Sequence, residues 1–349
     1  MAPQPLKSYL PWSKSPLIIN APMAGFAGHR LATAVSLAGG LGFIGGEPTT
    51  DFRAEFTAAS EILSSSSLQS HSTNTLPIGV GLLAFVLKIE DVVPLIGEFK
   101  PAIAWLFAAK QLDDYATWAK AIREASPETK VWVQVGSVAA AMHVAKTVAP
   151  DALCMQGADA GGHGFESGCS IISLLPEATD TLARGGFGEI PLVAAGGIVD
   201  GRGVAAALTL GAEGVVMGTR FLASEEVMVH PKYQAAVLEA RDGGQVTKRS
   251  KLFDCLRGPN VWPEAYDGRS LLVQSYQDHA SGVNLLEIQK LHKEAITGED
   301  KGFATGLKGR ASIWAGTGCG MVNQVESANN IVENVRKESV AILGKVSML

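Results

Sequence analysis

The feature that most constrains the fold is an alternation of short apolar runs with segments of helical spacing. Eight such runs are nearly continuously apolar, which is typical of parallel strands that are covered on both faces. The predicted strands are Leu17–Ala21, Leu41–Gly45, Ile78–Leu83, Ala102–Phe107, Lys130–Val135, Asp151–Gln156, Ile190–Ala195 and Gly214–Gly218.

The segments between these runs carry helix signals. Ser137 is a suitable N-cap for a helix over Val138–Val148, and Gly211 is a suitable stop for a helix over Val204–Leu210. Eight strands, each followed by a helix, predict an α/β protein of the (β/α)8 TIM-barrel class, a fold of about 250 residues. A doubly wound open sheet is the alternative, because the number of strands alone does not establish closure.

Size and composition fit a large α/β enzyme. The chain has 349 residues, of which 47% are hydrophobic and 18% charged, and its net charge is −5. It can bury a sizeable core, as one large domain or as a domain with an appendage. The negative charge and the lack of a basic cluster argue against nucleic acid as a partner. The four cysteines are scattered without a CxxC pair, so we expect no metal site and no disulfide framework.

The ends of the sequence bear on cellular location. The first seven residues lack the apolar core of a signal peptide, and no apolar run approaches the ~20 residues of a membrane span. We therefore expect a cytoplasmic protein that is not bound to a membrane. The terminal Ser347-Met348-Leu349 faintly resembles a peroxisomal tripeptide, which leaves the peroxisome as a weaker alternative.

Composition changes after the eighth predicted strand. Residues 223–312 are richer in charge and polar turns, and they show helical patches without strand–helix alternation. We expect residues 1–222 to form the barrel and residues 223–312 to form a mainly helical lid over its substrate side. Residues 313–349 are expected to complete the barrel as a C-terminal helix. Trp262, Phe303 and Trp314 are candidates to line the lid, although such aromatics are more often ordinary core.

A single histidine among glycines follows the sixth predicted strand. The segment Asp159-Ala-Gly-Gly-His-Gly164 places His163 at the exit of that strand. Glycine lets backbone approach a bound molecule, and imidazole can exchange a proton near neutral pH. Because parallel barrels work at the C-terminal ends of their strands, His163 is the candidate catalytic base. Glu166 could steer the imidazole, but a solvated loop charge is the more ordinary explanation of it.

Two glycine-containing loops predict a phosphate site. Ala195-Gly-Gly-Ile198 follows the seventh predicted strand, and Met217-Gly-Thr-Arg220 follows the eighth. Barrels commonly hold phosphate at these two positions, where backbone N–H groups and a helix dipole favour an anion. The hydroxyl of Thr219 adds a donor. A tight turn would explain Gly196-Gly197 alone, but the two loops together favour phosphate.

The type of phosphate ligand follows from which motifs are present. There is no Walker lysine pattern and no G-x-G-x-x-G after the first strand. A cofactor with its phosphate at strands 7 and 8 and its ring near strands 1 and 5 would be flavin mononucleotide (FMN). The backbone at Met23-Ala24 could face the ring, and the amide of Gln134, in an otherwise apolar strand, could donate to it. Hydrogen bonding of Gln134 to neighbouring backbone is the alternative.

Four motifs carry a family resemblance: Ala21-Pro-Met-Ala-Gly25, Gln156-Gly-Ala-Asp-Ala-Gly-Gly-His-Gly164, Ala194-Ala-Gly-Gly-Ile198 and Met217-Gly-Thr-Arg-Phe221. Together they resemble the nitronate monooxygenases, formerly called 2-nitropropane dioxygenases. Trp314-Ala-Gly-Thr-Gly318 also resembles a family segment that returns to the active site. The resemblance covers most of the chain and is loosest over residues 223–312. A class of flavin enoyl reductases shares the same framework.

This resemblance implies FMN-dependent oxidation of alkyl nitronates, and of nitroalkanes, by O2 to a carbonyl compound and nitrite, with His163 as the base. The implied partners are a small-molecule substrate and O2. Two alternatives stay open: an FMN-dependent NAD(P)H reductase of enoyl groups, and a flavin-binding accessory protein without turnover. Monomer and dimer are both open. The positions expected to contact FMN are Pro22, Met23, Ala24, Gly81, Gln134, Gly161, Gly162, Ala195, Gly196, Gly197, Gly218 and Thr219.

Overall fold

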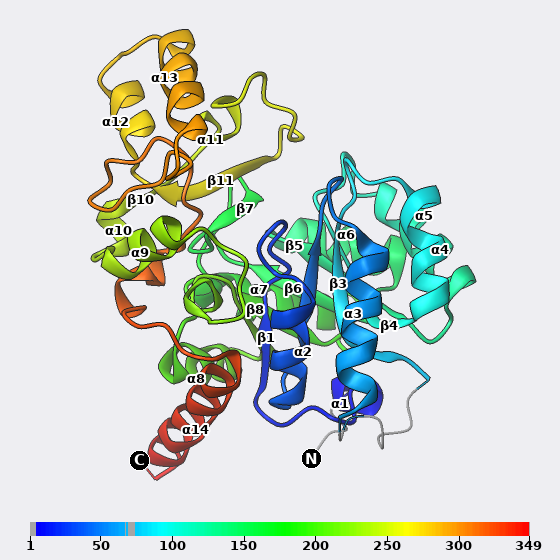
Figure 1. Ribbon diagram of the computed structural model, residues 1–349. Helices are drawn as coiled ribbons and strands as arrows, with labels where there is room; N and C mark the ends of the chain where they lie inside the picture. Colours follow the sequence, from blue (N-terminus) through cyan, green and yellow to red (C-terminus); the bar gives the residue numbers. More distant parts are fainter. Residues whose placement is uncertain (1–4, 67, 69–73, 349) are drawn as a thin grey trace.

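Eight parallel strands form a nearly closed barrel (Figure 1). The computed structural model describes residues 5–66, 68 and 74–348. Neighbouring strands pair in the order β1-β9-β8-β6-β5-β4-β3-β2, and a single parallel bridge between Ile19 and Leu41 joins the two ends. The predicted TIM barrel is therefore confirmed. Its strands are β1 Leu17–Asn20, β2 Phe43–Gly46, β3 Leu76–Leu83, β4 Pro101–Phe107, β5 Lys130–Val135, β6 Ala152–Gln156, β8 Leu192–Ala195 and β9 Gly214–Met217.

Helices alternate with these strands. The hydroxyl of Ser137 accepts a hydrogen bond from the Ala140 amide at 3.2 Å, which confirms the predicted N-cap of α6. Gly211 follows the end of α8 with φ of +103°, a conformation that glycine adopts readily. The helices of this part are α1 Pro5–Tyr9, α2 His29–Leu37, α3 Phe52–Ser64, α4 Ile89–Phe99, α5 Asp114–Ala125, α6 Val138–Val148, α7 Ile171–Arg184, α8 Gly201–Thr209 and α14 Ala328–Val346.

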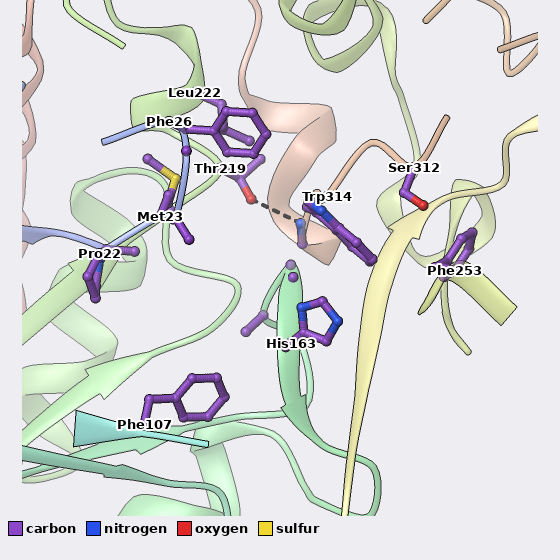
Figure 2. Close-up of a pocket in the computed structure, with 18 of the residues that line it drawn as sticks. Pro22, Met23, Phe26, Phe107, His163, Thr219, Leu222, Phe253, Ser312 and Trp314 are labelled. Carbon is purple, nitrogen blue, oxygen red and sulfur yellow. Dashed lines mark hydrogen bonds between the residues drawn. The ribbon is translucent and has the colours of Figure 1, made fainter. Parts of the chain in front are cut away.

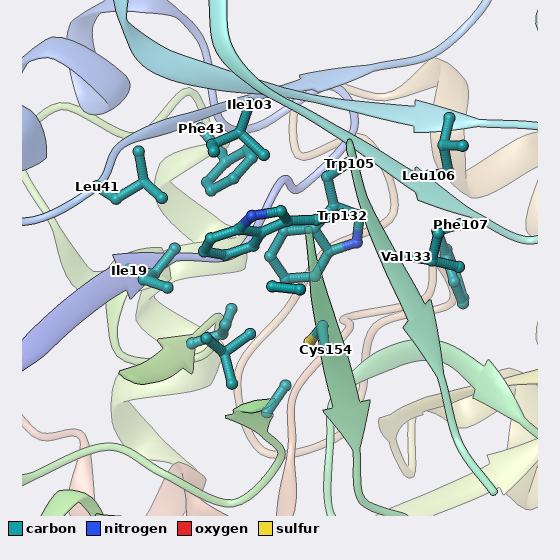
Figure 3. Close-up of a cluster of buried hydrophobic side chains, with 14 of the residues drawn as sticks. Ile19, Leu41, Phe43, Ile103, Trp105, Leu106, Phe107, Trp132, Val133 and Cys154 are labelled. Atoms are coloured by element: carbon teal, nitrogen blue, oxygen red, sulfur yellow. The ribbon is translucent and has the colours of Figure 1, made fainter. Parts of the chain in front are cut away.

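Large aromatic side chains form part of the buried core of the barrel (Figure 3). Trp105 and Trp132 are at most 1% exposed, and their ring centroids lie 6.0 Å apart. Phe43 meets Trp105 edge-to-face at 5.1 Å. The Trp132 indole N–H reaches the hydroxyl of Tyr9 at the N-terminal ends of the strands, whereas the Trp105 indole N–H reaches Gln134 near their C-terminal ends. The core thus continues up to the functional end of the barrel.

Strand β7 and most of the residues between β9 and α14 form a second unit over the C-terminal ends of the strands (Figure 1). Helices predominate there, as expected, but the unit also contains a three-stranded antiparallel sheet in the order β10-β11-β7 that the sequence did not reveal. Strand β7 (Gly162–Phe165) is the segment that we had expected to be the histidine loop. The other elements are η2 Phe221–Ala223, α9 Pro231–Glu239, α10 Gly243–Val246, β10 Thr247–Ser250, α11 Leu252–Cys255, β11 Tyr266–Leu271, α12 Gln274–Ala280, α13 Leu285–Thr297 and η3 Thr317–Met321.

The chain returns to the barrel through α14, which packs against α8 and α2. A terminal helix is thus present, but it covers Ala328–Val346, whereas the expected range began at residue 313; a short η3 helix and loops precede it. Among the described residues, no helix is both long and apolar enough to cross a bilayer. Leu349, the last residue of the terminal tripeptide, lies outside the described residues.

Candidate active site

A cavity of about 920 Å³ lies between the C-terminal ends of the barrel strands and the second unit (Figure 2). This volume suits a cofactor together with a small substrate. All thirteen residues that the sequence predicted for the site line this one cavity: Pro22, Met23, Ala24, Gly81, Gln134, Gly161, Gly162, His163, Ala195, Gly196, Gly197, Gly218 and Thr219. The structure thus brings the predicted residues together around one cavity.

His163 lies on β7 and is held from two sides by aromatic rings. Its ring stacks on Trp262 with centroids 3.6 Å apart and planes 6° apart, and the Trp314 ring lies 4.8 Å away. The backbone of His163 pairs with Gly268 of β11. Gly268 has to be small, because an added Cβ would lie 2.4 Å from the Trp314 ring. The imidazole is therefore fixed in orientation and still borders the cavity.

Asp254 is a site residue that sequence reasoning missed. Its Oδ1 lies 2.6 Å from His163 Nε2, and the two side chains are 4% and 13% exposed. Its Oδ2 is buried without a hydrogen-bond partner among the described residues. Glu166, the carboxylate that the sequence offered for this task, instead forms an exposed ion pair with Lys251. No local signal marks Asp254, because it is brought to His163 from 91 positions away by α11.

The loops after β8 and β9 present unpaired backbone donors to the cavity. Gly196 and Gly197 have φ of +112° and +74°, which favour glycine. Within the described residues, the N–H groups of Gly197, Gly218 and Thr219 have no hydrogen-bond partner. The hydroxyl of Thr219 accepts a bond from the Gly316 amide at 2.9 Å, so its own hydrogen is free to donate (Figure 2). These groups can bind an anion.

Gln134 has one satisfied and one free end. Its Oε1 accepts a hydrogen bond from the Trp105 indole at 3.1 Å, which fixes the orientation of the amide. Its Nε2 has no partner among the described residues, and the side chain is 7% exposed in the cavity wall. Among the described residues no backbone group bonds to the Gln134 amide: its acceptor pairs with the Trp105 side chain and its donor has no partner.

Two glycines in the cavity wall lie close to other segments of the chain. An added Cβ on Gly81 would lie 2.3 Å from the Pro22 Cβ, so this glycine makes room for the loop after β1. An added Cβ on Gly161 would lie 2.4 Å from the Gly316 nitrogen. The segment around Trp314 therefore returns directly against the histidine segment, as the family resemblance implied. Gly81 has a packing role besides its place in the cavity wall.

The second unit supplies an aromatic wall that includes Trp262, Phe303 and Trp314, all three of them sequence candidates. Tyr233 joins them; burial raises the pKa of its hydroxyl, which donates to the Trp314 carbonyl at 3.1 Å. His292 of α13 also lines the cavity, which its polar sequence context did not indicate. Burial, helped by Arg257 and Arg310, lowers the pKa of His292 and favours its neutral form. The described residues contain no group of three or more His, Cys, Asp or Glu placed to hold a metal ion.

Comparison with known proteins places this geometry in a family. Residues 116–338 match the family model described as nitronate monooxygenase. The chain is 45% identical to nitronate monooxygenase npaC of Metarhizium robertsii, over 98% of this chain and 96% of the relative. It is 39% identical to a nitronate monooxygenase of Neurospora crassa, over 98% and 93% of the two chains.

Solved structures share the fold. FabK from Thermotoga maritima superposes with a TM-score of 0.76 at 26% identity, over 99% of both chains. A nitroalkane oxidase from Streptomyces ansochromogenes superposes with a TM-score of 0.70 at 23% identity, over 95% of this chain and 98% of that one. At this level of identity, the second comparison supports the barrel architecture only.

Proposed function

This chain belongs to the nitronate monooxygenase family of oxidoreductases, and from that premise we propose that it binds FMN and oxidises alkyl nitronates with O2, with His163 as the base for neutral nitroalkanes. The observation that carries the proposal is the meeting of His163, the free amide of Gln134 and the unpaired loop N–H groups around one cavity. A small-molecule substrate and O2 are the partners that it requires.

The residues present fit FMN. The unpaired N–H groups of Gly197, Gly218 and Thr219 would bind its phosphate, and Gln134 Nε2 would donate to its ring. The backbone of Pro22, Met23 and Ala24, together with Gly81 and Gly161, Gly162, Ala195 and Gly196, would complete the cradle. When bound, FMN supplies the electron-accepting chemistry by which O2 converts a nitronate to a carbonyl compound and nitrite.

The chain's own contribution is to move a proton and exclude water. In a neutral nitroalkane, His163 would take the proton from the carbon beside the nitro group, and the electron pair of that C–H bond would pass into the nitro group. A preformed nitronate needs no such step. The aromatic wall of the second unit covers the cavity, and we propose that residues 223–312 act as its lid while residues 1–222 and 313–349 form the barrel.

An anaerobic mixing experiment tests this function. The purified yellow protein is mixed with a nitronate, or with NADH or NADPH, and flavin bleaching is followed. We expect rapid bleaching by the nitronate. Bleaching by NAD(P)H alone would instead indicate a reductase, and bleaching by neither would indicate a flavin-binding protein without turnover. Purification without FMN would overturn the cofactor assignment. A cytoplasmic location stays a prediction.

The variant His163→Asn separates proton transfer from oxidation. Loss of a general base typically lowers the rate about 10²–10⁴-fold. We expect a loss of that order for a neutral nitroalkane and a much smaller loss for the preformed nitronate, measured as nitrite release. Equal losses on the two substrates would contradict the role of His163 as the base.

A further inference from the structure

His163 and Asp254 form a short and largely buried hydrogen bond. The 2.6 Å separation between His163 Nε2 and Asp254 Oδ1 is that of a charge-assisted hydrogen bond. Both side chains are largely removed from water, which strengthens the interaction. A second His–Asp contact of equal length, His143–Asp113, is 41% and 72% exposed, and so it serves as a comparison.

The direction of this hydrogen bond follows from chemistry. An ionised carboxylate can only accept, so Nε2 of His163 carries the hydrogen. In the neutral ring, the lone pair must then lie on Nδ1, which has no partner among the described residues. His163 thereby presents a proton acceptor that is not already engaged by the protein.

Among the described residues, the other charged groups near the pair have partners of their own or make no hydrogen bond or ion pair with Asp254. Arg249 of β10 is bound to Asp267 of β11 at 2.7 Å, and Lys251 is bound to Glu166 beyond β7. Arg257 and His292 line the same cavity, yet neither has a hydrogen bond or ion pair with Asp254 in the part of the chain that the structure describes. His163 is thus the single partner of this buried carboxylate there.

We propose that Asp254 is a positioning residue: it holds His163 in the tautomer with a free Nδ1 and stabilises the imidazolium that forms when Nδ1 takes a proton from a neutral nitroalkane. The inference rests on the proposed function for its catalytic consequence. The tautomer itself is a property of the protein with or without a substrate.

The test uses the FMN-loaded protein and the variant Asp254→Asn, with Glu166→Gln as a matched loss of a carboxylate near the histidine. The ¹⁵N NMR signals of His163 report which ring nitrogen carries the hydrogen. We expect wild type and Glu166→Gln to show hydrogen on Nε2 and a bare Nδ1. Asp254→Asn is expected to lose this single tautomer, because an amide can donate as well as accept.

Activity gives the second readout. Asp254→Asn is expected to lower nitrite release from a neutral nitroalkane by about 100-fold, and by far less from the preformed nitronate. An unchanged tautomer in Asp254→Asn, or equal losses on both substrates with a folded protein, would overturn the inference. If Asp254→Asn does not fold, Asp254→Glu keeps the charge and is expected to keep the tautomer; a changed tautomer would refute the assignment. A wild-type enzyme inactive on every nitronate would refute the proposed function, whereas the NMR result would still decide the pairing.

Discussion

Gln134 links the barrel core to the cavity through one amide group. Its Oε1 accepts from the buried Trp105 indole, and its Nε2, which has no partner among the described residues, is the donor that we propose for the flavin ring. Gln134→Leu should therefore weaken FMN binding about tenfold, the effect of one hydrogen bond of roughly 1–1.5 kcal/mol. It should also lower the free energy of unfolding of the apoprotein by about 1–3 kcal/mol, because the indole N–H loses its acceptor. Fluorescence titration and urea unfolding measure the two effects.

Trp105→Phe is the companion variant for Gln134. It removes the indole donor and leaves Nε2 in place, so we expect it to reduce FMN affinity less than Gln134→Leu does. Wild-type FMN affinity in Gln134→Leu would show that this amide does not contact the cofactor.

The site residues that could be predicted from the sequence are those whose sequence neighbours are unusual. His163 among glycines and Gln134 in an apolar strand stand out locally, and both line the cavity. Asp254 and His292 do not stand out, because a carboxylate or an imidazole in a polar stretch is unremarkable until the fold buries it. Their place in the site depends on contacts between segments that are far apart in the sequence, and one sequence alone does not show which distant segments meet.

Gly197, in the loop after β8, matters both for the backbone conformation of the loop and for the proposed phosphate site. Gly197 has φ of +74°, and its N–H, which has no hydrogen-bond partner among the described residues, is one of the donors that we propose for the phosphate. Gly197→Ala would place a Cβ 3.1 Å from that of Asp159 and force a left-handed backbone, at a cost of about 1–2 kcal/mol in folding free energy. We expect FMN affinity to fall about tenfold or more as well, because the loop can no longer hold its donors on the phosphate.

Gly186 provides the control for the stability cost of placing alanine in a left-handed backbone conformation. It has φ of +83°, an added Cβ would meet nothing within 4 Å, and it follows α7 away from the cavity. Gly186→Ala should therefore show a similar loss of stability with unchanged FMN affinity. Equal FMN affinities in the two variants, measured by titration of the apoproteins, would argue against the phosphate site.

Whole elements differed in how far they could be predicted. The barrel strands are buried on both faces, so their continuous apolar runs mark them in the sequence. Strands β7 and β10 read Gly-His-Gly-Phe and Thr-Lys-Arg-Ser, with no apolar period, and they exist because β11 pairs with both. That pairing moves His163 from an expected loop to a strand with a fixed register. A composition change showed the second unit, but not its sheet.

The seam of the barrel lies between β1 and β2, the two strands at the ends of the sheet order. Among the described residues, strands β1 and β2 share no ladder beyond the bridge between Ile19 and Leu41, and the Asn20 side chain adds two hydrogen bonds with the backbone of Phe43. Helix α14, at the C-terminal end of the chain, packs beside this seam against α2 and β1. The guanidinium of Arg336 on α14 donates to the carbonyls of Pro16, before β1, and of Ala38 and Gly39, before β2. Burial lowers the pKa of Arg336, yet arginine keeps its charge. One side chain thus ties both edges of the seam.

Arg336→Met is expected to lower the free energy of unfolding by about 2–4 kcal/mol, because three carbonyls lose a charged donor while the apolar stem is kept. The exposed neighbour Lys337→Met should change it by less than about 0.5 kcal/mol. Because the carbonyls that Arg336 binds precede β1 and β2, at the end of the barrel opposite the cavity, FMN affinity in the folded variant should equal that of wild type. Urea unfolding and FMN titration of both variants test this division. If Arg336→Met were as stable as Lys337→Met, the seam would be closed by the strands themselves and not by the terminal helix.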